Sequence, residues 1–121
     1  MAEKKVSIVT GGASGLGAAI SELLAARGAT VVVADLDEAA ARAMQKKIES
    51  RGGSALAVRV DVTSANDVSA MVSAVIAAHG RIDSLVNTAG LLGRVAPLDE
   101  VTAEDLDRTL AVNVKGVFNV T

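Results

Sequence analysis

The feature that most constrains the fold is a glycine-rich turn near the start of the chain. Residues 10–17 read T-G-G-A-S-G-L-G and follow a short apolar run at residues 6–9. The run predicts a buried strand, and the apolar residues after the turn recur at helical spacing. Glycine permits tight turns and close approach to a pyrophosphate, and a helix amino terminus offers it free N–H groups. The form is T-G-x-x-x-G-x-G instead of G-x-G-x-x-G, and an ordinary turn is the alternative.

Strand and helix patterns alternate along the rest of the chain. We expect further strands at residues 30–34, 56–62 and 82–86, and helices over 38–50, from Ser64 to Gly80 and from Thr102 towards Thr121. Short connections between such elements predict right-handed crossovers and a parallel sheet in the order 3-2-1-4. This is an α/β, Rossmann-type doubly wound fold, with residues 1–121 in one domain. The first helix, closed by Gly28, should face the sheet with Leu16, Ala19, Ile20, Leu23 and Leu24.

Composition narrows the classes of partner and site. Half of the residues are hydrophobic but Phe118 is the only aromatic one, which suits buried parallel strands flanked by helices. A net charge of -2 offers no basic field to nucleic acid or to an anionic membrane. The absence of cysteine excludes a disulfide framework, a thiolate metal site and a cysteine nucleophile, and we predict no metal site. With a polar start and short apolar runs, the chain is expected to be soluble and cytoplasmic.

Asp35 is the candidate for binding a ribose. It ends the second expected strand, about 20 residues beyond the glycine turn, where a carboxylate can accept hydrogen bonds from the hydroxyls of an adenosine ribose. The alternative is that Asp35 caps the next helix, but Asp37 stands closer to that helix and is at least as good a cap.

Four segments, in this order along nearly the whole chain, resemble the short-chain dehydrogenase/reductase family. They are residues 10–17, the pair 61–62, the N-T-A-G run at 87–90 and the N-V-K-G run at 113–116. The resemblance implies a nicotinamide dinucleotide as cofactor. It also implies the cofactor-binding residues, which are Gly11, Ser14, Gly15, Leu16, Gly17, Asp35, Leu36, Asp61, Val62, Asn87, Ala89 and Gly90.

The resemblance also implies particular roles. Asp61 and Val62 would contact adenine, and the alternative for Asp61 is a strand-end or capping acid. The run 87–90 matches the family's N-N-A-G, which lines the nicotinamide ribose, and Thr88 departs from the second Asn by losing the amide while keeping a hydroxyl. Asn113 matches the catalytic Asn whose backbone carbonyl holds a water of the proton relay. Without the family, Asn113 is a polar interruption in an apolar helix.

The implied activity is hydride transfer between NAD(H) and a small alcohol or carbonyl compound. NAD is expected over NADP because the Asp35 carboxylate would repel a 2′-phosphate, and because Ser14 and Leu36 stand where NADP-preferring relatives carry a basic residue. The family's acid/base is a tyrosine, and the chain contains none, so we expect a truncated, inactive amino-terminal half of an enzyme. The apolar terminal helix suggests a homo-oligomer. A non-catalytic nucleotide-binding or subunit-interaction module is the alternative, whereas the runs at 87–90 and 113–116 argue against a methyltransferase using S-adenosylmethionine.

Overall fold

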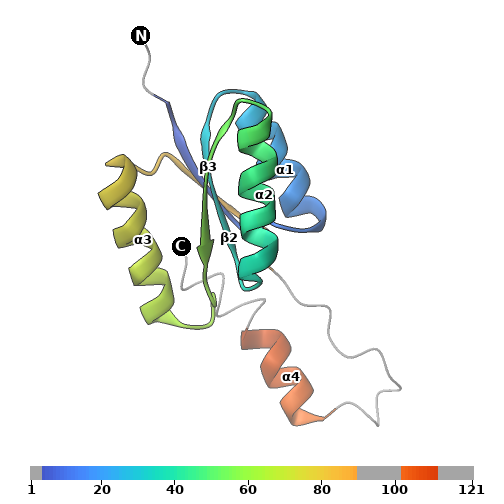
Figure 1. Cartoon of the computed structure of the whole chain (residues 1–121). Coiled ribbons are helices and arrows are strands. Elements are labelled where there is room, and N and C mark those ends of the chain that lie inside the picture. The colour runs from blue at the N-terminus through green and yellow to red at the C-terminus, as the bar shows by residue number, and fades with distance from the viewer. Residues whose placement is uncertain (1–3, 90–101, 112–121) are drawn as a thin grey trace.

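Residues 4–89 form a four-stranded parallel sheet with helices on both faces (Figure 1). The computed structural model describes residues 4–89 and 102–111. The strand order is β3-β2-β1-β4, which confirms the topology predicted from the sequence. In chain order the elements are β1 (Val6–Thr10), α1 (Gly15–Ala26), β2 (Thr30–Asp35), α2 (Glu38–Ser50), β3 (Ser54–Arg59), α3 (Ala65–His79), β4 (Ser84–Asn87) and α4 (Ala103–Leu110).

Two hydrophobic clusters hold the helices to the sheet. Alternate residues of a strand point to opposite faces, so that Val32 of β2 joins the cluster under α3 and Val33 joins the cluster under α2. On the α3 side the cluster includes Met71, and on the α2 side it includes Met44. Because both faces of the sheet are covered, β1 is buried along its whole length and β2 along all but its last residue.

The helix ends follow the sequence signals. Asp37 caps α2 by accepting from the Ala40 amide at 3.0 Å, and Ser64 caps α3 by accepting from the Asp67 amide at 3.2 Å. Thr102 and Asp105 form a reciprocal capping box at α4. Each such cap is worth about 0.5–2 kcal/mol. The turn at Gly80, with φ of 75°, ends α3 as expected.

The expected bounds of two strands were wrong by a few residues. β3 starts at Ser54 and ends at Arg59 because it pairs with β2 residue by residue, from Thr30 opposite Ser54 to Asp35 opposite Arg59. β4 starts at Ser84, which pairs with Ser7. The length of the neighbouring strand therefore determines the bounds, and the local apolar pattern does not contain that information.

The expected sheet-facing stripe of α1 was also partly wrong. Leu16 is 71% exposed and Leu23 is 51% exposed, and Ala19 is exposed as well. The buried residues of α1 are small, namely Gly17 and Ser21. The Ser21 hydroxyl donates to the carbonyl oxygen of Gly12 at 3.0 Å. Small residues therefore form the buried face of α1 against the glycine turn, and Leu16 and Leu23 lie outside that face.

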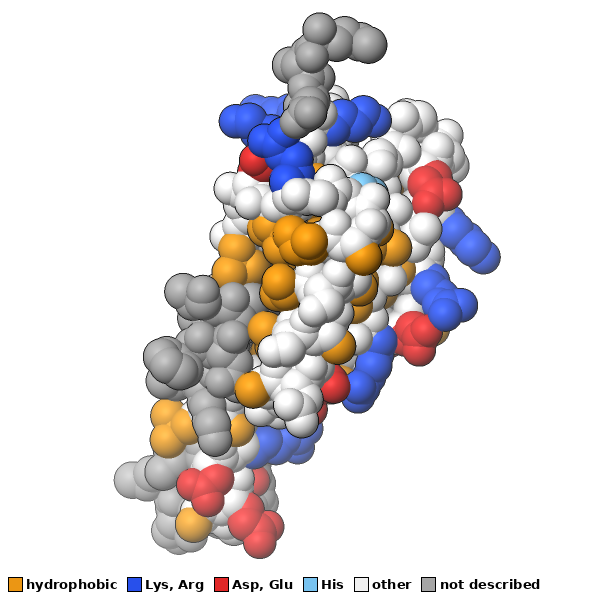
Figure 2. All heavy atoms as spheres, turned by 90° about the vertical axis from the view of Figure 1, so that its left-hand side faces the viewer, with side chains coloured by type: hydrophobic (Ala, Val, Ile, Leu, Met, Phe, Trp, Pro, Cys, Tyr) orange, Lys and Arg blue, Asp and Glu red, His pale blue; other side chains and the backbone are white. Residues whose placement is uncertain are grey.

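Hydrophobic side chains also gather on the outer side of α3, as Figure 2 shows from that direction. Val72 is 37% exposed and Ile76 is 46% exposed there. Within the two described stretches, no helix combines the length and apolarity needed to cross a membrane.

Candidate cofactor-binding cleft

A cleft of about 740 Å³ lies at the carboxyl ends of the strands. Open α/β sheets bind their ligands at this edge. The glycine turn, the end of β2, the residues after β3, the residues after β4 and the last turn of α4 line it. It brings together Gly11, Ser14, Gly15, Leu16, Gly17, Asp35, Leu36, Asp61, Val62, Asn87 and Ala89. The two other expected residues, Gly90 and Asn113, lie outside the described residues.

Two kinds of constraint require glycine in the turn. Gly11 and Gly15 have positive φ angles of 64° and 54°, which residues with a Cβ rarely adopt. Gly17 has no such angle, but a Cβ there would lie 2.0 Å from the carbonyl oxygen of Gly11. Around Gly15 no atom lies within 4 Å of the Cβ position. The turn is therefore packed tightly on the sheet side and open at Gly15.

The amino terminus of α1 is the one helix start in the described chain that no side chain caps. Ser14 occupies the N-cap position and makes no side-chain cap hydrogen bond, and the first turn contains no acidic residue. By contrast, side chains cap α2, α3 and α4. The first amides of a helix lack partners within the helix and attract anions. The start of α1 thus fits a phosphate group without a competing carboxylate in its first turn.

Hydrogen bonds from the end of β4 hold the glycine turn in place. The Thr88 hydroxyl donates to the carbonyl oxygen of Thr10 and, at 3.4 Å, lies within reach of that of Gly11. The Thr10 hydroxyl, fully buried, donates to Oδ1 of Asn87 at 3.1 Å and accepts from the Ala89 amide at 3.3 Å. Thr88, which stands where the family has its second Asn, therefore uses its hydroxyl to link the loop after β4 to the glycine turn.

Asp35 braces the glycine turn from the end of β2. Its Oδ2 accepts from the Ala13 amide at 3.1 Å, and its Oδ1 accepts from the Asp37 amide at 3.1 Å. A carboxylate has about four acceptor positions, so each oxygen retains capacity for a donor in the cleft. The alternative of a helix cap is excluded for Asp35 because Asp37 caps α2.

The carboxylate of Asp61 is held by the turn that follows β3. Its Oδ1 accepts from the Thr63 hydroxyl at 2.6 Å and from the Thr63 amide at 2.9 Å. These bonds, the hydroxyl first, lower the pKa of Asp61 below its ordinary value and keep it ionised. Asp67 fixes the same turn by accepting from the Asp61 amide at 3.0 Å. Asp61 therefore acts as a strand-end acid while it lines the cleft.

Sequence reasoning missed several cleft residues. Thr63, Arg108 and Ala111 line the cleft and were not among the expected site residues, and Thr88 belongs to the expected run 87–90 but was not itself assigned a contact. Thr63 and Thr88 are next to expected residues in the sequence, so including the whole of each loop in the predicted site would have found them. Arg108 and Ala111 belong to the last turn of α4, and its position at the cleft depends on the tertiary structure and leaves no local signal.

A smaller cavity of about 270 Å³ lies between α1 and α2. Glu22 lines it and forms ion pairs with Lys47 at 2.6 Å and with Arg51 at 3.2 Å. The hydrogen bond from Lys47 is the main cause that lowers the pKa of Glu22. Among residues 4–89 and 102–111, no group of three His, Cys, Asp or Glu side chains could hold a metal ion.

Known proteins resemble this chain in sequence and in fold. A family model described as short chain dehydrogenase matches residues 5–121. D-threitol dehydrogenase of Mycolicibacterium smegmatis is 43% identical over 114 residues, covering 94% of this chain and 44% of that protein. The crystal structure of a Brucella melitensis 3-ketoacyl-(acyl-carrier-protein) reductase complexed with NADH has a TM-score of 0.91 at 39% identity, covering 98% of this chain and 48% of that one.

A metagenomic short-chain oxidoreductase in complex with NADP has a TM-score of 0.89 at 36% identity, covering 96% of this chain and 52% of that one. The chain therefore spans about half the length of the relatives that it matches.

Proposed function

The chain belongs to the short-chain dehydrogenase family, and from that premise we propose that its cleft binds NAD and that the intact protein is an NAD-dependent oxidoreductase. The reaction would move a hydride between the nicotinamide ring and a small alcohol or carbonyl compound. The observation that carries this proposal is one cleft that joins an uncapped helix amino terminus to the carboxylate of Asp35. These two features match the pyrophosphate and the adenosine ribose of a dinucleotide.

Each part of the cofactor has residues of suitable chemistry. The amides at the start of α1, with Ser14, would bind the pyrophosphate, and Asp35 would accept from the ribose hydroxyls. The turn at Asp61 and Val62 would contact the adenine. Asn87 and Ala89 would line the nicotinamide ribose. The preformed hydrogen bonds of Thr88 and Asp35 hold these loops in place before a ligand arrives, which lowers the entropic cost of binding.

The preference for NAD over NADP rests on Asp35. A carboxylate placed to accept from the 2′-hydroxyl would face a 2′-phosphate of like charge in NADP and would lose the hydroxyl donor. The combined penalty should be about 2–4 kcal/mol, or roughly 30- to 1000-fold in affinity. The solved relatives include both an NADP and an NADH complex, so the preference is proposed from this chain's own residues.

The residues of this chain would bind and orient the cofactor, and they would not supply the proton transfer that the reaction needs. When bound, NAD supplies the hydride acceptor. The family resemblance assigns proton transfer to a tyrosine, and the chain has no tyrosine, so the proton donor and acceptor would come from outside these 121 residues. We propose that the backbone carbonyl of Asn113 holds a water of the proton relay. We also propose cytoplasmic function and homo-oligomer formation through residues 112–121, which lie outside the described residues.

Cofactor preference in the intact protein tests the proposal. Steady-state rates with NAD and NADP, over a panel of secondary alcohols and followed by nicotinamide absorbance, should give kcat/KM at least about 30-fold higher with NAD. Asp35→Ala should abolish most of this ratio. Because Asp35 also braces the glycine turn, the ratio is more informative than the loss of activity, since a loosened turn would weaken both cofactors alike.

Asp37→Ala is the matched control. It removes a carboxylate two residues away and a helix cap worth about 0.5–2 kcal/mol, and it should leave the NAD to NADP ratio unchanged. Equal efficiency with both cofactors in the unsubstituted protein would contradict the assignment of Asp35. The absence of turnover with either cofactor, in folded intact protein and over the whole alcohol panel, would contradict the oxidoreductase.

A further inference from the structure

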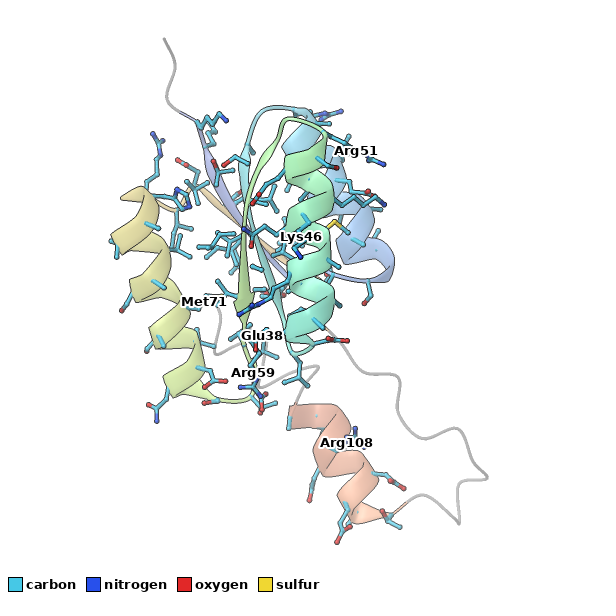
Figure 3. The ribbon with its side chains drawn as sticks, viewed as in Figure 1. Glu38, Lys46, Arg51, Arg59, Met71 and Arg108 are labelled. Atoms are coloured by element: carbon cyan, nitrogen blue, oxygen red, sulfur yellow. The ribbon has the colours of Figure 1, made fainter. Side chains whose placement is uncertain are left out.

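Arg108 is the single cationic residue that lines the cleft among the residues the structure describes. The other charged lining residues are Asp35 and Asp61. Arg108 lies in the last turn of α4, the end of that helix nearer the sheet (Figures 1 and 3). Its side chain is exposed, and no hydrogen bond or ion pair joins its guanidinium to a described side chain. Within residues 4–89 and 102–111, no side chain therefore competes with a ligand for the guanidinium.

The charged residues that line the cleft have a net negative charge, so an anionic dinucleotide would bind better with a cation there. With Arg108, the three charged lining residues sum to -1, and without it they sum to -2. The pyrophosphate of a dinucleotide is an anion itself, and the start of α1 offers only about half of a positive charge. The two carboxylates already accept from Ala13, Asp37 and Thr63, so neither depends on Arg108 for a partner.

We propose that Arg108 determines cofactor affinity by binding the pyrophosphate together with the amino terminus of α1. This inference rests on the proposed function, since it takes the ligand to be a nicotinamide dinucleotide. Guanidinium groups bind phosphate oxygens through charge-assisted hydrogen bonds. We assign the contact of Arg108 to the pyrophosphate instead of to a 2′-phosphate, because Asp35 and Asp61 at the ribose end would repel a further anion.

Calorimetric titration of the intact protein tests the assignment with four ligands: NAD, NADP, ADP and adenosine. Arg108→Gln should weaken the three that contain a pyrophosphate by a similar factor of about 2 to 5, as expected for a partly exposed charge pair. Adenosine should bind unchanged. Arg108→Lys retains the charge and should stay within about twofold of the unsubstituted protein. Because Arg108 is exposed, the loss should shrink from about 0.1 M to about 1 M salt, as the screening length falls from about 10 Å to about 3 Å.

Lys46→Gln is the matched control for net charge. Lys46 is exposed on α2 and does not line the cleft (Figure 3). This substitution removes the same charge and should leave all four affinities unchanged. An equal loss in Lys46→Gln and Arg108→Gln would make the effect a general one of net charge and would overturn the proposal.

Other results would overturn it in distinguishable ways. Unchanged NAD affinity in Arg108→Gln would remove Arg108 from the site, and a loss confined to NADP would move its contact to the 2′-phosphate. A similar loss for adenosine, without rescue by lysine, would make the role structural. If the unsubstituted protein, shown to be folded, binds neither NAD nor NADP, the proposed function fails and this inference fails with it. If only the role of Arg108 is wrong, the unsubstituted protein still binds NAD, and this result separates the two proposals.

Discussion

Replacing Gly17 by alanine tests the packing that shapes the cleft. The added Cβ would lie 2.0 Å from the carbonyl oxygen of Gly11, 2.7 Å from its carbonyl carbon and 2.5 Å from the hydroxyl oxygen of Thr88. Cβ contacts below 3.0 Å are essentially never observed, so the Gly11 oxygen and α1 must separate by at least about 1.0 Å. Two of the three contacts are backbone atoms, which cannot move aside as a flexible side chain can.

The cost can be estimated from the two changes that the shift imposes. Overpacking of this kind costs about 1–3 kcal/mol, and disturbing the Thr88 hydroxyl hydrogen bond costs about 0.5–1.5 kcal/mol. We therefore expect Gly17→Ala to lower the free energy of unfolding by about 2–4 kcal/mol, out of a typical 5–15 kcal/mol. Displacement of the turn should also weaken NAD binding at least about tenfold.

Gly28→Ala is the matched control, because the same methyl group is added without a clash. Gly28 has φ of 93°, and no atom lies within 4 Å of its Cβ position. Alanine there pays only the backbone cost of a left-handed conformation, about 1–2 kcal/mol. Gly28 does not line the cleft, so NAD binding should be unchanged.

Urea unfolding of the intact protein gives the stabilities, and calorimetric titration gives the NAD affinities of the three proteins. The reasoning is refuted if Gly17→Ala is no less stable than Gly28→Ala and binds NAD as tightly as the unsubstituted protein. In that case the close approach of α1 to the glycine turn is not what requires glycine at position 17.

Three further predictions concern the hydrogen bonds and the edge of the sheet. Thr88→Val removes the hydroxyl donor to Thr10 and should cost about 0.5–1.5 kcal/mol in urea unfolding; an unchanged midpoint would show that this bond is unimportant. Thr63→Val should raise the pKa of Asp61 toward its ordinary value in a carboxyl NMR titration. The hydrogen bonds that lower the pKa of Asp61 stabilise the fold at pH values above its ordinary pKa, and this stability is lost as the pH falls through the lowered pKa. The stability of the variant should therefore change less between neutral and acidic pH. An unchanged titration would contradict Thr63 as the cause of the lowered pKa. The 121-residue chain alone should self-associate, because the outer edge of β4 has no partner strand within the described part, and a monomer at all concentrations in sedimentation would refute this.

Local patterns sufficed for the topology and for most of the cleft. Apolar strands and capped helices alternate, and such units fold into a parallel sheet with little choice of strand order. Once the order is known, the residues that follow each strand meet at one edge. Gly11, Asp35, Asp61 and Asn87 are separated in sequence and nevertheless line the same cleft.

The features that the sequence did not reveal depend on contacts between residues that are far apart in the chain. Leu16 and Leu23 are exposed, whereas Ser21 is buried and contacts the glycine turn, and a helical repeat alone cannot show which face of α1 is buried. The partner of the Thr88 hydroxyl lies 78 residues away. Arg108 and Ala111 of α4 line the cleft, and their closeness to the other lining residues depends on the tertiary structure, which the sequence around Arg108 does not indicate.

NMR mapping of NAD binding on the isotope-labelled intact protein locates the cofactor site directly. We expect saturable amide shifts to concentrate at residues 11–17, at Asp35 and Leu36, at residues 61–63 and at Asn87 to Ala89, the segments that line the cleft at the carboxyl edge. Shifts confined to the cavity between α1 and α2, around Glu22 and Lys47, or no shifts at saturating NAD in a folded protein, would contradict it.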